Sequence, residues 1–360
     1  MTVNADRYFN HAEELKNKAE YNDALLLFGK ASEAYKNDND SEGILNCFMS
    51  IGDTCRMTGN FKLAEVNYSR AIKLSEKMKD DVTLTDAAVG LGLSLRALGR
   101  WKEAISLFSK AKRFYVKSKD NHGMAFVSWA EGGAYRVKGD ISGAIKSFKK
   151  SLELFNAMKY KPGAGYNLCG LGGSCRVAGL FNDSLKYYSA ANRLFTDLKD
   201  PFGIAYSHCG IGNALRMKND FRGALMHFGK AAVLYRKIGD IVSYSYTLWS
   251  FGKTYTMLGK LDKAMDYFKQ SGMLFKRTKD PRGIIYCRLG MGEVEFLRGN
   301  LPSARRNFKS ALRDSMDNKF AVEACHSKTL LSFMDGKIDN RCYNRLGLKL
   351  RFKTIPFNIP

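Results

Sequence analysis

Proline, acidic residues and long apolar runs are scarce in this chain of 360 residues. It has six prolines, and its 58 Lys and Arg residues outnumber its 35 Asp and Glu residues, so the formal net charge is +23. No stretch of eighteen apolar residues occurs, which predicts no membrane span. The first residues lack the apolar core of a signal peptide, so we expect a cytoplasmic protein.

Motifs for metal binding and catalysis are also missing. The eight cysteines form no Cys-x-x-Cys pair and the five histidines form no His-x-x-x-His pair, so neither a metal site nor a cofactor is predicted. No nucleophile beside a general base and no phosphate-binding loop is recognisable, which argues against an enzyme. Cys169 and Cys209 lie one repeat apart, which favours cysteine as a small hydrophobe in a reducing compartment over a disulfide framework.

What the chain does contain is a forty-residue repeat without insertions or deletions. Glycine recurs at Gly52, Gly92, Gly132, Gly172, Gly212, Gly252 and Gly292. Each glycine is followed at fixed distances by a small, an aromatic and a second small residue, for example Ala104, Phe108 and Ala111. These spacings of four and three place the three side chains on one helical face. A period of this length with this regularity predicts a solenoid of stacked helical units.

Turn residues divide each unit into two antiparallel helices. A second glycine column suits the left-handed position that ends the first helix: Gly59, Gly99, Gly139, Gly179, Gly259 and Gly299. Aspartates between the units can cap the next helix: Asp80, Asp120, Asp200 and Asp280. Pro201 and Pro281 then occupy the first helical position that proline prefers.

The repeat columns resemble those of the tetratricopeptide repeat, in its forty-residue subclass that includes the Leu-Gly-Asn repeat adaptors and the Rap-type bacterial regulators. One copy of the pattern is Leu168, Leu171-Gly172, Cys175, Ser184, Tyr188 and Ala191. The resemblance implies an all-α, right-handed superhelical solenoid. We expect eight repeats within residues 1–335, followed by a capping helix and an extended tail at 336–360. The resemblance implies little about function, because this fold is a scaffold for many partners.

Arginines stand at the same phase of five consecutive repeats and are predicted to face the concave side. In this fold family the first helix of each pair lines that side, and aromatic residues share its inward face. The predicted partner-binding residues are Arg56, Arg96, Arg136, Arg176, Arg216, Phe126, Trp129, Tyr166, Tyr206, Tyr246, Trp249, Tyr286 and Phe296. Arginine recognises carboxylates bidentately, and aromatic side chains provide anchoring area. We therefore expect a scaffold or adaptor that binds an acidic peptide or protein segment, with an apolar part of the ligand near Tyr246 to Phe296.

Other interpretations stay open at this stage. The arginines could brace neighbouring carboxylates or favour helix ends, although few acids are in phase with them. Arginine with stacking aromatics also suits RNA or single-stranded nucleic acid, and resemblance to Rap-type proteins suggests a ligand-sensing regulator. Gly132-Gly133 and Gly172-Gly173 inside helices indicate the close approach of a neighbouring helix or of a ligand.

The outer helices and the carboxyl terminus carry two further expectations. Basic groups such as Lys149-Lys150 fall on the second helices, where they either keep the solenoid soluble or attract an anionic partner. Residues 338–350 are predicted to form a last capping helix. The tail at 351–360 is expected to cover the end of the core. The alternative is that it docks in a groove, its own or a neighbour's, as an autoinhibitory or self-associating segment.

Overall fold

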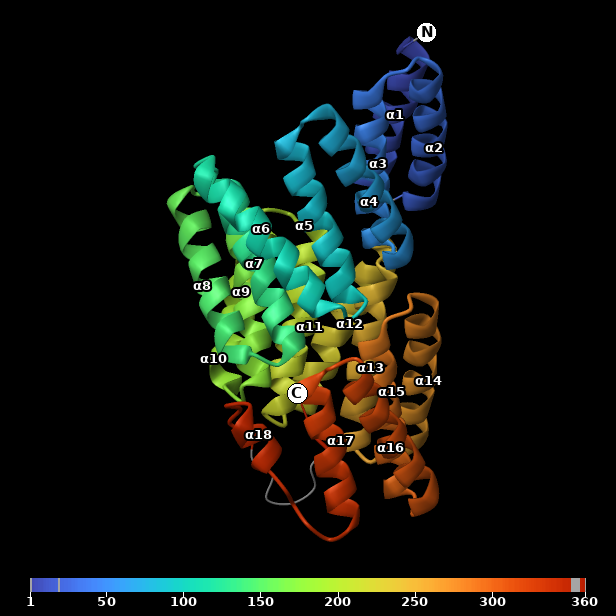
Figure 1. Cartoon of the computed structure of the whole chain (residues 1–360). Coiled ribbons are helices and arrows are strands. Elements are labelled where there is room, and N and C mark those ends of the chain that lie inside the picture. The colour runs from blue at the N-terminus through green and yellow to red at the C-terminus, as the bar shows by residue number, and fades with distance from the viewer. Residues whose placement is uncertain (1, 19, 351–356, 360) are drawn as a thin grey trace.

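Eight antiparallel helix pairs followed by two further helices make up the part of the chain described by the computed structural model, residues 2–18, 20–350 and 357–359. The first helices of the pairs are α1 (Thr2–Asn17), α3 (Ser41–Met57), α5 (Asp81–Ala97), α7 (Asn121–Lys138), α9 (Lys161–Val177), α11 (Pro201–Met217), α13 (Ile241–Met257) and α15 (Pro281–Leu297). The second helices are α2 (Tyr21–Asn37), α4 (Phe61–Met78), α6 (Trp101–Lys117), α8 (Ile141–Ala157), α10 (Phe181–Asp197), α12 (Phe221–Ile238), α14 (Leu261–Arg277) and α16 (Leu301–Asp317). The chain continues into α17 (Ala321–Met334) and α18 (Arg341–Arg345). The predicted all-α solenoid of eight repeats is confirmed (Figure 1).

Helix boundaries follow the predicted turn chemistry. The carboxylates of Asp80, Asp120, Asp200 and Asp280 each accept a hydrogen bond from a backbone N–H in the first turn of the next helix, at 2.9–3.0 Å. Such caps satisfy donors that have no partner within the helix. The glycines that end the first helices have positive φ, as at Gly99 with 81°.

Aromatic rings of the second helices form the core by filling spaces that glycines leave. At Gly92 a Cβ would lie 2.5 Å from the Phe108 ring of its own repeat. The ring of Phe148 packs against Gly132 of its own repeat and Gly170 of the next. A side chain at these glycines would push the helices apart, so the glycine column sets the spacing between neighbouring repeats.

The solenoid curls until its early repeats touch its late ones (Figure 1). We call this contact the seam and define it by the turns at Gly59, Gly99, Gly139 and Gly179, which pack against residues 242–349 of the later repeats. A Cβ at Gly99 would lie 2.8 Å from Phe320, and one at Gly139 would lie 3.0 Å from Ala321. The indole N–H of Trp101 donates to the carbonyl of Lys319 at 3.3 Å. Val242 and Phe320 of the seam also border a cavity on the concave side.

The carboxyl-terminal region differs from two expectations. Only Arg341–Arg345 is helical within the predicted capping helix at 338–350, so that expectation is wrong. The helix stops because Gly347 adopts φ 68° and the following residues pack as an extended strap, in which the Lys349 N–H donates to the Ala178 carbonyl at 3.0 Å. The expected capping of the core is performed by this strap, since Leu348 and Leu350 are buried in a cluster with residues of α8, α9 and α17.

Cysteine usage also departs in part from the expectation. Six cysteines are free, and five of these are buried, as expected for small hydrophobes. Cys325 and Cys342, by contrast, form a disulfide that ties α17 to α18. Their separation of 17 residues has no relation to the forty-residue period, so the repeat pattern gave no sign of the pairing.

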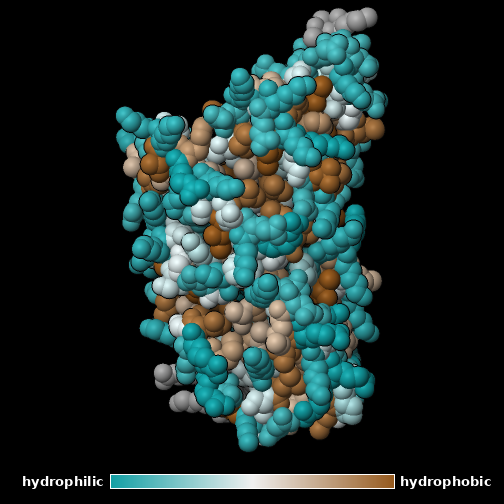
Figure 2. Space-filling view, in the orientation of Figure 1, coloured by the Kyte–Doolittle hydropathy of each residue, from teal (hydrophilic) through white to brown (hydrophobic). Residues whose placement is uncertain are grey.

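The visible outer face is covered largely by hydrophilic side chains, with hydrophobic patches between them (Figure 2). Lys110 and Lys150 are exposed one repeat apart on α6 and α8, in agreement with the basic outer surface that the sequence predicts. Among the described residues no helix is both long enough and apolar enough to cross a membrane.

Candidate functional site

The concave surface encloses a cavity of about 810 Å³ that reaches from α3 to α15. Most residues predicted for the partner site line it together: Arg56, Arg96, Arg136, Arg176, Phe126, Trp129, Tyr166, Tyr206, Tyr246, Trp249 and Tyr286. The two predicted residues outside the cavity lining are Arg216 and Phe296. Both contact the chain's own carboxyl-terminal segment instead.

Three consecutive arginines on α5, α7 and α9 face the cavity without an acidic partner. We call Arg96, Arg136 and Arg176 the arginine strip. No described carboxylate forms an ion pair or hydrogen bond with any of the three guanidinium groups, and Arg136 Nε, Arg176 Nε and Arg176 Nη1 are buried without a hydrogen-bond partner. Arg56, one repeat earlier, does have a partner, Asp53, at 3.3 Å. Partial burial without pairing is costly for a charged group, so the strip is poised for an anion.

Electrostatic repulsion runs along the arginine column. Desolvation, together with the charges of Arg136 and Arg56, lowers the pKa of Arg96 to about 10. For Arg216, desolvation and the charge of Arg176 bring the pKa to about 9. The positive charges of neighbouring repeats therefore repel one another. An anionic ligand would reduce this repulsion for several of the guanidinium groups.

The second glycine of each pair inside the helices makes room for an arginine of the preceding repeat. A Cβ at Gly133 would overlap Nη1 of Arg96, and a Cβ at Gly173 would lie 2.5 Å from Nη1 of Arg136. Each guanidinium thus lies against the next repeat. At Gly132 and Gly172 the close neighbours are instead the rings of Phe148 and Tyr188 on the second helices. The close approach that the sequence indicates at the four glycines therefore comes from side chains of neighbouring helices.

The aromatic residues of the predicted site differ in how much of their surface is exposed to solvent. Phe126 is 36% exposed and packs 5.6 Å from Trp129, whose ring lies 5.7 Å from the Arg96 guanidinium. Trp249 and Tyr286 are only 5% and 7% exposed and belong to the core. The apolar end of the predicted site is therefore mostly packed interior, whereas the aromatic residues near the strip present surface to the cavity.

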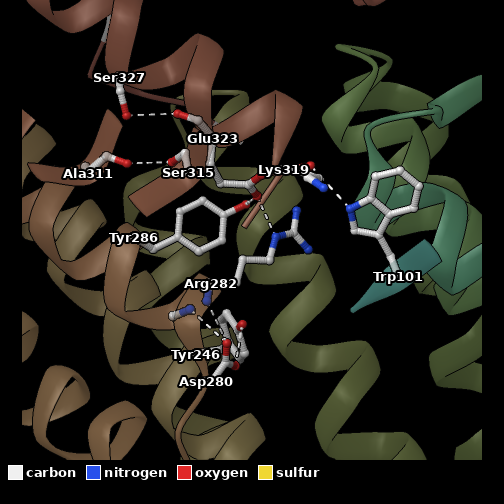
Figure 3. Close-up of polar contacts among 11 residues, drawn as sticks. Trp101, Tyr246, Asp280, Arg282, Tyr286, Ala311, Ser315, Lys319, Glu323 and Ser327 are labelled. Atoms are coloured by element: carbon white, nitrogen blue, oxygen red, sulfur yellow. Dashed lines mark hydrogen bonds and ion pairs between the residues drawn. The ribbon is translucent and has the colours of Figure 1, made fainter. Parts of the chain in front are cut away.

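Polar groups of the late repeats at the cavity pair with one another (Figure 3). The Tyr246 hydroxyl donates to Asp280 at 2.7 Å, and the Tyr286 hydroxyl donates to Glu323 at 2.7 Å. Arg282 forms an ion pair with the same Glu323 at 2.5 Å. Desolvation raises the pKa of the buried Asp280 carboxyl. Because these groups already have partners, they shape the cavity more than they offer binding capacity.

The carboxyl-terminal segment lies at the end of the concave surface. Its main anchor is Asn358, whose side-chain oxygen accepts from Arg216 Nη1 at 2.5 Å and whose amide donates to the Arg216 carbonyl at 3.0 Å. Arg216 Nη2 donates to the Ile359 carbonyl at 3.1 Å, and Lys253 Nζ donates to the Phe357 carbonyl at 2.5 Å. Of the predicted tail at 351–360, residues 357–359 are described, and the others lie outside the described residues. Phe357 and Ile359 are buried in the core of the late repeats, as expected for a tail that covers the core, and Asn358 binds Arg216 on the chain's own concave side. Self-association through the tail stays a prediction.

Several cavity residues escaped the sequence analysis. One group sits one helical turn before the predicted aromatic column and lines the same face: His122, Pro162, Phe202, Val242 and Arg282. Their forty-residue spacing was visible, so extending the inward face by one turn would have found them. Within the described residues no group of three or more His, Cys, Asp or Glu side chains could hold a metal ion.

Comparison with known proteins supports the fold and leaves the activity open. No protein family model and no curated protein matches the sequence. Among solved structures, a Rap conjugation gene regulator of the plasmid pLS20 in complex with the Phr* peptide has a TM-score of 0.68 at 15% identity, covering 88% of this chain and 95% of its own. A Rap protein complexed with competence and sporulation factor has a TM-score of 0.61 at 12% identity, covering 93% and 99%. A STAND protein with a tetratricopeptide repeat sensor from Pyrococcus horikoshii has a TM-score of 0.51 at 18% identity, covering 89% and 55%.

These likenesses place the chain among all-α solenoids of the tetratricopeptide type, with the architecture of the Rap regulators. At such low identity they show the fold and no more.

Proposed function

We propose that the chain is a non-enzymatic binding protein that holds a short acidic peptide segment in its cavity. The observation that carries the proposal is the arginine strip: three neighbouring guanidinium groups without carboxylate partners in an enclosed space. Carboxylates pair with guanidinium groups through strong charge-assisted hydrogen bonds. The two Rap proteins above were solved in complex with the Phr* peptide and with competence and sporulation factor, and the first of these agrees with a peptide as the ligand class.

Enclosure favours a short peptide over a nucleic acid. The seam joins the turns of repeats two to five to the later repeats, so a continuous polymer could follow the groove only if those contacts opened. Exposed aromatic surface beside the strip is limited to a few residues such as Phe126, whereas single-stranded nucleic acid needs a series of stacking platforms. A ligand-sensing regulator is compatible with the proposal, because binding inside a closed superhelix can alter how repeats pack.

The test measures binding of a fluorescent pentaglutamate peptide by anisotropy to the full chain and to Arg136→Ala/Arg176→Ala. We expect the double variant to bind about 100-fold more weakly, since two charge-assisted contacts are lost. The matched control is Lys110→Ala/Lys150→Ala, which removes the same charge from the exposed outer face. The control should change affinity by no more than about threefold at physiological salt.

Two results would reject the proposal. One is an equal loss of peptide affinity in both double variants, which would show that the affinity depends on the net charge of the protein and not on the arginine strip. The other is that a labelled oligouridine binds more tightly than the peptide and loses its affinity in Arg136→Ala/Arg176→Ala. That result would show that the strip binds nucleic acid.

A further inference from the structure

The segment Phe357–Ile359 occupies a subsite at the end of the arginine column. We call the residues that receive it the tail subsite: Arg216, Lys253, Phe296 and Phe333. The Phe357 ring lies 5.6 Å from Phe296 and 5.9 Å from Phe333 and is 2% exposed. The subsite therefore binds a peptide in a defined way: two apolar rings hold an aromatic side chain, and two cations hold the oxygens around it.

The tail supplies neutral oxygens to a fully buried cation. Arg216 is 0% exposed, and its guanidinium donates to Asn358 Oδ1, the Ile359 carbonyl and Asn213 Oδ1. Lys253 has a carboxylate partner in Glu293, but no carboxylate contacts the Arg216 guanidinium in the described residues. An amide oxygen is a weaker partner for a guanidinium than a carboxylate. A peptide with an acidic residue at the position of Asn358 would pair better with Arg216.

The direction of the bound segment is defined by its contacts. Phe357 packs on α15 and α17, whereas the Ile359 carbonyl reaches Arg216 on α11, so the segment runs against the order of the repeats. Arg176 of the strip is one repeat further along and close enough to lower the pKa of Arg216. A peptide that enters like the tail and continues in this direction would bring its following residues to the strip.

We propose that the tail subsite belongs to the ligand site and takes an aromatic residue followed by an acidic one, with further acidic residues of the ligand directed toward Arg176 and Arg136. The chain's own Phe357 and Asn358 fill the subsite until such a peptide displaces them. This inference rests on the proposed function and adds to it the sequence order and the polarity of the ligand.

The test compares two capped peptides of equal composition, Phe-Asp-Ile-Glu-Glu-Glu and its reverse, with hexaglutamate as the reference probe. Each is titrated by calorimetry into the full chain and into Phe357→Ala/Asn358→Ala, which weakens the competing tail. We expect the double variant to bind the forward peptide about tenfold more tightly than the unmodified chain does. The reverse peptide and hexaglutamate should gain no more than about twofold.

A second variant guards against a general effect on folding. Phe296→Ala removes one ring of the tail subsite and leaves the arginines in place, so it should abolish the preference for the forward peptide over the reverse one. Equal gains for both peptide orders, or no gain for the forward peptide, would overturn the inference while hexaglutamate binding still supports the proposed function. Failure of hexaglutamate to bind any of the proteins would refute both.

Discussion

The arginine column divides into two parts that differ in what covers them. Arg96, Arg136 and Arg176 face a cavity and lack carboxylate partners, whereas Arg216 is buried under the chain's own carboxyl-terminal residues. The four residues have the same type and the same phase in the repeat. Their surroundings differ because the tail extends from the last repeats no further than Arg216 in the sixth repeat.

The difference indicates how one column can serve both folding and binding. At Arg216 the guanidinium is part of a packed end and receives three oxygens from within the chain. At the strip, the same side chain lies against the glycine of the next repeat and its partner must come from outside. A buried cation without a partner lowers stability. Under the proposed function, an anionic ligand would compensate for this cost at the strip.

The largest expected effect is a difference in the free energy of unfolding between variants of Arg216 and variants of the strip. Arg216→Ala should lower the free energy of unfolding by about 2–4 kcal/mol, because Asn358 and the Ile359 carbonyl lose their partner in a buried site. Arg136→Ala/Arg176→Ala should change it by less than about 1 kcal/mol, since these groups have few internal partners to lose. Urea unfolding followed by tryptophan fluorescence measures both. The comparison fails if the strip variant is as unstable as Arg216→Ala.

The fold could be predicted from sequence because its determinants lie close together along the chain. The Asp120 cap, the left-handed Gly99 and the Phe148 ring between two glycines all involve residues within one repeat or its neighbour. Such contacts recur every forty residues, so each copy reinforces the others. The inward face of the arginines followed from the same periodicity.

What could not be predicted involves contacts without a period. The bond from Trp101 to Lys319 spans 218 residues, and the one from Arg216 to Asn358 spans 142. Neither separation is a multiple of forty, and both depend on how tightly the solenoid curls. The degree of burial was a further surprise: Trp249 lines the cavity as its phase predicts, but it is only 5% exposed because Tyr286 of the next repeat packs against it.

Acid should loosen the packing of α17 against the segment that carries α18. His326 on α17 is fully buried, its Nδ1 lies 2.7 Å from the Tyr343 hydroxyl, and desolvation lowers its pKa from 6.5 to about 3. The charged groups that influence it are Glu323, Lys253, Arg282 and Arg176. Because the folded pKa lies below the unfolded one, the stability that neutral His326 contributes is complete above pH 6.5 and is lost as the pH falls toward 3.

We therefore expect the free energy of unfolding to fall by on the order of 3 kcal/mol between pH 6.5 and pH 4 through this residue. His326→Gln, which cannot titrate, should flatten the profile over that window. Urea unfolding at several pH values provides the measurement. A profile with the same slope in the variant would show that other groups, such as the buried carboxylates of the cavity wall, govern acid sensitivity.

The smallest expected effect concerns the seam. The variant Gly99→Ala tests it, and the equivalent position of another repeat, Gly299, provides a matched control. Gly99 and Gly299 end first helices with φ of 81° and 82°, so alanine is strained to the same degree at both. Only at Gly99 would the new Cβ meet the opposite side, 2.8 Å from Phe320, whereas nothing lies within 4 Å at Gly299. Gly99→Ala should therefore cost about 1 kcal/mol more than Gly299→Ala and release the acidic peptide faster. Stopped-flow dissociation and urea unfolding of the two variants measure the difference. Equal behaviour would mean that the seam does not help to retain the ligand over the open arginines.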